Sequence, residues 1–158
     1  MRTLSLVTAL TLAATPLAAQ DDHDHISEAD GLRIVHAWTP ATKGSETLIY
    51  MEIENETNSL QTLTGAETED GLTAELVGFT YVDGVEAWEN LPAIPIASGQ
   101  HLDLAPRAVA FRLSGLNAAL TVGEEVKMEV MFGDLHLDAH VAVEDEDATD
   151  HSHAGHNH

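Results

Sequence analysis

The sequence predicts an all-β domain, built as an antiparallel sandwich or barrel. Apolar and polar residues alternate along several short runs, and turn-forming residues separate these runs about every ten residues. No stretch shows a convincing helical period of apolar residues. The chain has 158 residues, of which 44% are hydrophobic, so it holds enough apolar material for one core. We therefore expect a single domain.

The predicted strands follow one another from residue 47 onward. Residues 47–54 and 102–104 alternate between apolar and polar positions, and residues 108–113 form an almost continuous apolar run typical of a buried strand. Two further strands each have one apolar face, formed by Val126, Met128, Val130 and Phe132 and by Leu135, Leu137, Ala139, Val141 and Val143. Gly133 and Asp134 stand between these two strands and predict a hairpin.

The first 19 residues have the pattern of a secretory signal peptide. Arg2 precedes an uncharged apolar run over residues 4–14, and Leu17-Ala18-Ala19 offers a cleavage site of small residues. The apolar run is shorter than the roughly 20 residues that a membrane-spanning helix needs. We expect cleavage after Ala19, export to the periplasm and no transmembrane segment.

Two acidic segments flank the predicted domain. Residues 21–30 contain five acids and two histidines, and residues 144–158 contain five acids and four histidines. Such compositions bury too little apolar surface to offset the entropy of ordering. The sequence thus divides into a signal peptide (1–19), an acidic flexible arm (20–30), a β domain (31–143) and a disordered His-rich tail (144–158).

Charge and composition exclude several classes of function. Six Lys and Arg against 27 Asp and Glu give a net charge of −21, which excludes nucleic acid as a partner. The chain has no cysteine, so a metal would have to bind His, Met, Asp or Glu. Neither an HExxH motif nor a glycine-rich phosphate loop is present, and we expect no enzyme.

Several motifs share their order with a known family. They are residues 35–42 (VHAWTPAT), 48–55 (LIYMEIEN), 94–99 (IPIASG) and 104–106 (LAP), followed by the stretch 116–132. Together they resemble the periplasmic copper chaperones of the PCu(A)C type. This resemblance implies a cupredoxin-like Greek-key β-sandwich and a copper-handling function.

The copper ligands of that family are missing from the matching positions. The resemblance implies a Cu(I) site of two Met and two His, ligands that suit a soft ion. Its His-x-Met falls on Ala110-Phe111-Arg112, its other Met within residues 84–88, and its first His near residues 77–78. None of the four ligands carries over. The cationic Arg112 opposes a metal at this place, and we hypothesise that it pairs with Glu86 instead.

The histidines of the tail are the main candidate metal ligands. Flexible His-rich tracts chelate borderline divalent ions through neutral imidazoles. The ligands predicted on this basis are His151, His153, His156 and His158, with His23 and His25 assisting. The alternative is a solvated tail that merely tolerates its histidines.

A second candidate lies on the last predicted strand. His136, Asp138 and His140 share one face, with same-face neighbours about 6.8 Å apart, and His36 could join them from an adjacent strand. The alternative is a solvent-exposed polar face. His101, beside Asp103, is interpreted as a surface residue.

These observations predict an exported copper-binding, metallochaperone-like protein that holds metal mainly through its His-rich ends. Two alternatives remain open, a periplasmic zinc-binding protein and a β-sandwich interaction module that binds no metal. The expected partners are metal ions and a copper-handling envelope protein, such as a cytochrome oxidase assembly factor.

Overall fold

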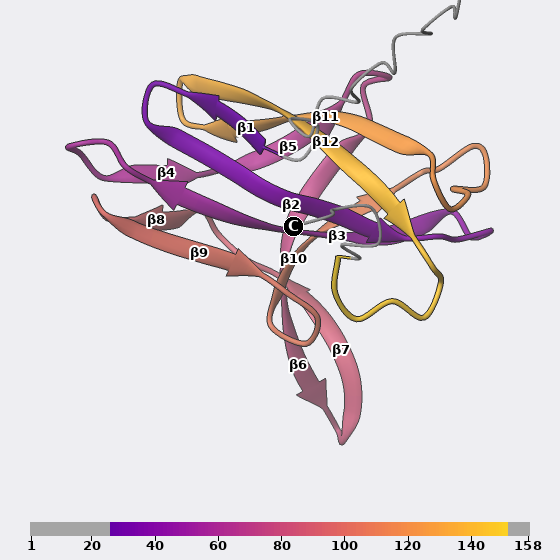
Figure 1. Cartoon of the computed structure of the whole chain (residues 1–158). Helices are drawn as coiled ribbons and strands as arrows, with labels where there is room; N and C mark the ends of the chain where they lie inside the picture. Colours follow the sequence, from indigo (N-terminus) through magenta and orange to yellow (C-terminus); the bar gives the residue numbers. More distant parts are fainter. Residues whose placement is uncertain (1–25, 152–158) are drawn as a thin grey trace, which may run out of the picture.

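The computed structural model describes residues 26–151, which form β-strands and loops without a helix (Figure 1). The predicted signal peptide and the histidines at 23, 25, 153, 156 and 158 lie outside the described residues. The strands are β1 (Ile26–Ala29), β2 (Leu32–Pro40), β3 (Glu46–Asn55), β4 (Gln61–Leu63), β5 (Gly65–Thr68), β6 (Thr73–Val82), β7 (Val85–Asn90), β8 (Ile94–Ile96), β9 (Gln100–Leu104), β10 (Val109–Ser114), β11 (Glu125–Phe132) and β12 (Leu135–Glu144).

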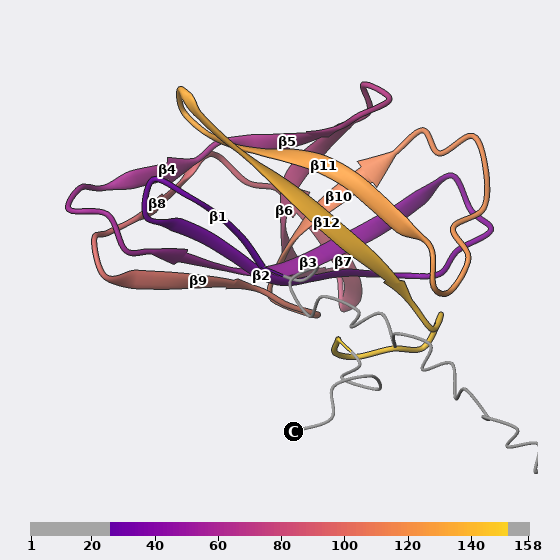
Figure 2. The ribbon, with the colours of Figure 1, turned by 45° about the horizontal axis from the view of Figure 1, so that its top comes forward.

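The main sheet closes on itself. Strand β2 pairs with β12 on one side and with β3 on the other, so β2, β12, β11, β5, β6, β10 and β3 form a ring (Figure 2). The β12 and β2 pairing is parallel, and the remaining pairings are antiparallel. β9 extends the sheet from β3, β7 from β6 and β1 from β2, while β4 and β8 form a separate pair. The predicted all-β sandwich or barrel is confirmed.

The interior follows the alternation of the sequence. The face of β3 that holds Ile49, Met51 and Ile53 is buried together with Phe111 of β10 and Val130 of β11. A second apolar group, the outer cluster, consists of Trp38, Tyr50, Val77 and Ala110. Ala148, from the segment after β12, packs against this outer cluster.

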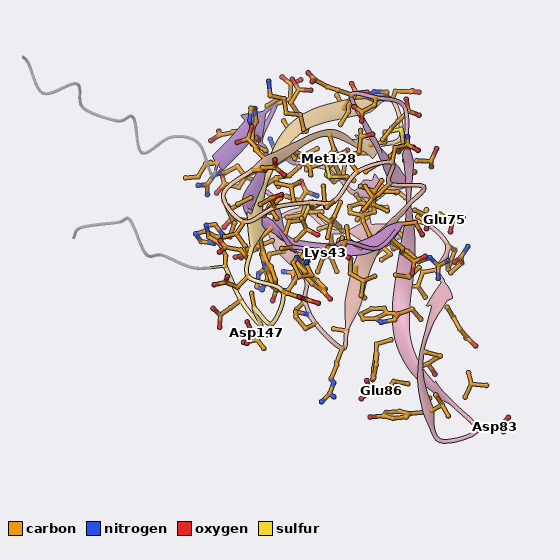
Figure 3. All side chains as sticks on the ribbon, turned by 90° about the vertical axis from the view of Figure 1, so that its right-hand side faces the viewer. Lys43, Glu75, Asp83, Glu86, Met128 and Asp147 are labelled. Carbon is orange, nitrogen blue, oxygen red and sulfur yellow. The ribbon has the colours of Figure 1, made fainter. Side chains whose placement is uncertain are left out.

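One hairpin projects from the body of the molecule. Strands β6 and β7 continue past their neighbours, and Asp83 lies at the far end of the hairpin (Figure 3). Tyr81, Val82 and Val85 near this end are 61%, 47% and 68% exposed. The hairpin therefore presents apolar side chains to solvent.

The prediction of a flexible arm over residues 20–30 is wrong for residues 26–29. Ile26–Ala29 form β1 and pair with β2, and the connecting Asp30 and Gly31 both have positive φ, as a two-residue hairpin turn requires. Arg33 of β2 contacts the Glu28 carboxylate at 3.5 Å. Backbone pairing and this cation order a segment whose composition alone predicts disorder.

The predicted disordered tail also begins too early. β12 runs to Glu144, and the segment that follows returns to the barrel through Ala148 and His151. Burial of these two side chains holds the segment against the barrel, which a composition count could not reveal.

The proposed ion pair between Arg112 and Glu86 is wrong. In the register of β10 and β6, Glu75 lies opposite Arg112, and their charged groups are 3.0 Å apart. Arg112 also donates to the Asn90 side-chain oxygen. Glu86 lies farther along the hairpin and pairs with Arg107 at 2.8 Å.

Candidate metal centre

A β-bulge presents His36 to solvent. The pairing of β2 with β3 shifts register between Val35 and Trp38, and His36, inside this interval, has a φ of 53°. Left-handed backbone at a residue other than glycine costs about 1–3 kcal/mol and often marks functional sites. Val35 and Ala37 are buried while His36 is exposed. The bulge thus places an imidazole on the surface of an otherwise buried stretch.

His151 packs against this imidazole. The rings of His36 and His151 are stacked, with centroids 5.8 Å apart and an interplanar angle of 29°. His151 is 9% exposed, and its Nδ1 lies 2.8 Å from an Oε1 of Glu144, which ends β12. A carboxylate at one ring nitrogen is the usual way in which proteins orient a metal-binding imidazole. Two imidazoles and a carboxylate therefore meet where the tail leaves the barrel.

A cavity of about 260 Å³ opens beside these rings. Its polar lining comes from His36, Glu52, Asp103, Thr149, Asp150 and His151. The pairing of β2 with β3 and of β3 with β9 brings His36, Glu52 and Asp103 together, and the segment after β12 adds the other three residues. The cavity is accordingly rich in groups that bind cations.

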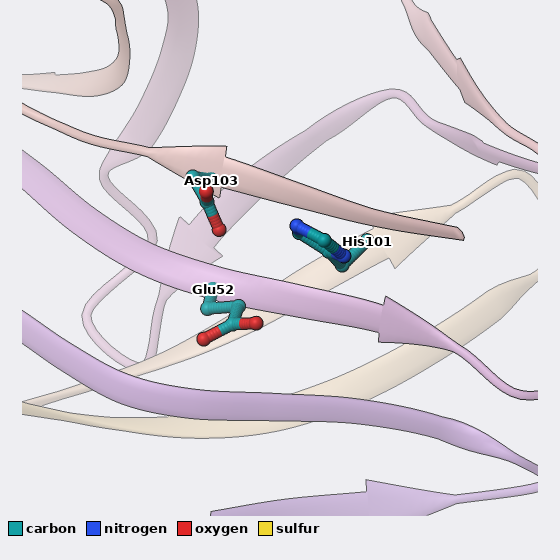
Figure 4. Close-up of side chains that lie close together, drawn as sticks. All are labelled: Glu52, His101 and Asp103. Carbon is teal, nitrogen blue, oxygen red and sulfur yellow. The ribbon is translucent and has the colours of Figure 1, made fainter. Parts of the chain in front are cut away.

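A further cluster, on β3 and β9, shares Glu52 and Asp103 with the lining of this cavity. One ligand atom from each of Glu52, His101 and Asp103 lies within 4.8 Å of the others (Figure 4). His101 is exposed, as the sequence suggests, and it also lies close to two carboxylates. Only the non-local pairing of β9 with β3 reveals its carboxylate neighbour on β3.

His136 and His140 share a face of β12, as predicted, but each contacts its own carboxylate. His136 Nδ1 lies 3.1 Å from Glu129 Oε1, and His140 Nδ1 lies 2.7 Å from Glu125 Oε1. Both carboxylates belong to β11. His36 lies on β2, which pairs with β12, and its ring stacks on His151. The structure thus places these two histidines in separate ion pairs rather than in one common group.

The outer cluster occupies the positions at which the resemblance would place copper ligands. Ala110 is fully buried against Val77 and the aromatic rings of Trp38 and Tyr50, whose centroids are 4.7 Å apart. Trp88 of β7 packs against the same group. Burial raises the pKa of the Tyr50 hydroxyl above its ordinary value of 10.0. This region is apolar and aromatic.

Solved structures share this fold. The chain superimposes on the copper-bound PCuAC domain from PmoF2 with a TM-score of 0.62 and 19% identity, covering 77% of this chain and 98% of that domain. For apo-DR1885 from Deinococcus radiodurans the TM-score is 0.54 with 24% identity, covering 92% of this chain and 99% of the other. The fold is thus that of the PCuAC domains, as the sequence resemblance implies.

The relatives in sequence define the family. The model of the LpqE-like family, described as "Putative lipoprotein LpqE-like", matches residues 32–144. The "Putative lipoprotein Lxx21020" of Leifsonia xyli subsp. xyli (strain CTCB07) is 25% identical over 142 residues, covering 84% of this chain and 86% of the relative. The chain belongs to the LpqE-like family and shares the fold of the PCuAC domains. Over residues 26–151, no helix is long and apolar enough to cross a membrane.

Proposed function

We propose that this protein is an exported, copper-binding, metallochaperone-like protein that holds copper mainly through its His-rich ends. The observation that supports this proposal most strongly is the stacking of His151 on His36, with Glu144 at the His151 ring. This arrangement fixes the first histidine of the tail on the barrel, directly before His153, His156 and His158 in the sequence.

The chemistry of these groups favours an oxidised, borderline metal ion. Imidazoles bind Cu(II) and Zn(II), and carboxylates nearby lower the cost of bringing a cation close. Thioethers select Cu(I), and the methionine that lines the cavity, Met51, is a buried core residue that packs with Ile49 and Ile53. We therefore propose Cu(II) as the ion that the tail and His36 bind.

The apolar outer cluster supports a shift of metal binding away from the place used by the PCu(A)C copper chaperones. A buried alanine and a guanidinium paired with Glu75 stand where the resemblance implies His and Met. Neither group coordinates a metal, and the permanent charge of Arg112 repels a cation. We propose that this part of the fold binds no copper.

Zinc is the second candidate ion, because a set of imidazoles and carboxylates suits zinc equally well. Copper is favoured by the likeness of the fold to a domain whose structure contains copper. A role in the envelope is supported by the relatives named as lipoproteins and by the expected signal peptide. A copper-handling envelope protein is the proposed partner, and the proposed role is binding rather than catalysis.

The test is a Cu(II) titration of the full chain, compared with a variant in which His151, His153, His156 and His158 are all alanine. We expect the four substitutions to weaken Cu(II) binding by about tenfold or more. The matched control replaces His136 and His140, which are exposed and ion-paired, and should retain the affinity of the wild type. Unchanged affinity in the tail variant would contradict the proposal.

The same titration separates copper from zinc. Competition between the two ions, repeated with Cu(I) under reducing conditions, should give the order Cu(II) above Zn(II) above Cu(I) at the tail. Preference for Zn(II) under cellular conditions would favour the second candidate.

A further inference from the structure

Glu52, His101 and Asp103 form a compact group on the outer surface of β3 and β9. In the register of these strands Glu52 lies directly opposite Asp103, and His101 is two residues from Asp103 on the same face. All three are at least partly exposed, and their ligand atoms lie within 4.8 Å of one another (Figure 4). Two strands thus hold three potential ligands at fixed spacing.

The two carboxylates of this group lie opposite each other on paired strands. Like charges directly opposite each other destabilise a sheet. The neighbouring Glu54 is paired with Arg33, which also contacts Glu28 and Glu56. In the part of the chain that the structure describes, no lysine or arginine forms an ion pair with Glu52 or Asp103. A bound cation would remove the repulsion between these two carboxylates.

We propose that Glu52, His101 and Asp103 form a second metal site, which takes a borderline divalent cation such as Zn(II). Zinc binds His nitrogen and carboxylate oxygen at about 2.0–2.2 Å. Two ligand atoms on one tetrahedral ion are then about 3.4 Å apart, and small rotations of exposed side chains reach this spacing. Three protein ligands leave a fourth position open to water or to another ligand.

The ligand types set the selectivity of this site. A single imidazole with two carboxylates favours Zn(II) or Cu(II), whereas Cu(I) prefers thioether and thiolate ligands. Calcium and magnesium prefer oxygen ligands throughout, so an imidazole nitrogen among three protein ligands favours zinc or copper over them. Glu52 and Asp103 also line the cavity beside His151, so an ion here would lie next to the base of the tail.

This site does not depend on the tail, and the two proposals can fail separately. The experiment is a titration of the full isotope-labelled chain with Zn(II) alone, followed by NMR at the His101 imidazole and at the backbone amides of residues 101–104. We expect these signals to move on addition of Zn(II). Signals from the tail histidines report the other site in the same spectra.

The variant for this test combines Glu52→Gln with Asp103→Asn, which keeps shape and removes both charges. The Zn(II) affinity reported at His101 should fall by about tenfold or more. The matched control is Glu67→Gln, which removes an exposed carboxylate from β5, a strand that pairs with β6 and β11, and should leave that affinity unchanged. Should the double variant fail to fold, His101→Asn provides the test, with the Glu52 amide as readout.

Two results would overturn the proposal. One is a His101 ring that gives no response to Zn(II) while the tail histidines respond. The other is an equal response at His101 in the wild type and in the variant without the two carboxylates.

Discussion

His36 combines an exposed imidazole with a left-handed backbone, and substitutions can separate the two. A β-branched residue tolerates positive φ poorly, so His36→Val should lower the free energy of unfolding by about 1–2 kcal/mol. Asparagine adopts this conformation more easily, so His36→Asn should retain most of the stability and lose the imidazole. Urea unfolding of both variants measures this difference. Equal stability of the two variants would contradict the claim that the left-handed backbone at residue 36 disfavours a β-branched side chain.

Tyr50 makes the stability of the fold sensitive to alkaline pH. Its raised pKa means that the folded chain keeps the phenolic proton at a pH at which the unfolded chain releases it. The folded state then binds more protons, so stability falls as the pH rises through about 10, the ordinary pKa of tyrosine, and beyond. Urea unfolding at about pH 9 and about pH 11 should show a smaller loss for Tyr50→Phe than for the wild type. An equal loss of stability in the wild type and in Tyr50→Phe would exclude Tyr50 as the cause of the pH dependence.

At the level of single strands, β10 shows why substitution to His and Met is not expected to restore a copper site. Ala110 is fully buried beneath Trp38 and Tyr50, so Ala110→His overfills the outer cluster. Combined with Arg112→Met, it should lower the free energy of unfolding by about 1–3 kcal/mol. It should add no Cu(I) affinity, because residues 77–78 and 84–88 still supply neither His nor Met. Thermal unfolding and a Cu(I) titration measure both effects, and gained Cu(I) affinity would contradict them.

The sequence predicts the strands that can be recognised from the alternation and turn residues of their own segment. The run 47–54 corresponds to β3, the run 108–113 to β10, and the Gly133-Asp134 hairpin joins β11 to β12. Two missed features have different causes. β1 forms a tight hairpin with the adjacent β2, and its acidic composition conceals it, because composition alone predicts disorder there. The group of Glu52 and His101 forms only when β9 pairs with the distant β3, and a single sequence carries no register between such strands.

The candidate metal sites are also only partly predictable from the sequence. The enrichment of histidine marks the tail directly, whereas the role of His36 depends on a bulge and on the return of the chain after β12. The sequence allows His36 to lie on a strand adjacent to His136 and His140, and β2 does pair with β12. The stacking of His36 on His151 depends on the bulge and on the path of the tail, which the sequence does not reveal.

For the whole molecule, the pH dependence of metal binding follows from the ligand type. An imidazole must be neutral to bind a cation, so Cu(II) affinity should decrease as the pH falls through about 6.5. Isothermal titration calorimetry of the full chain at several pH values measures this decrease. A constant affinity between about pH 5 and about pH 8 would argue for carboxylate ligands alone.

The acidic surface of the molecule favours this function without determining it. A net charge of −21 attracts cations from solution and keeps the protein soluble, whereas the histidines decide which cation is held. The first residues of the tail lie against the barrel, where His151 stacks on His36. A metal ion bound by the tail would therefore lie close to the surface of the folded domain.

Electron paramagnetic resonance of the full chain with one equivalent of Cu(II) tests directly whether the tail histidines and His36 bind the ion. We expect nitrogen couplings from at least two imidazoles, with one coupling lost in His36→Asn and the rest lost when the four tail histidines are replaced. A spectrum with oxygen ligands only, or nitrogen couplings that persist unchanged in both variants, would contradict this proposal.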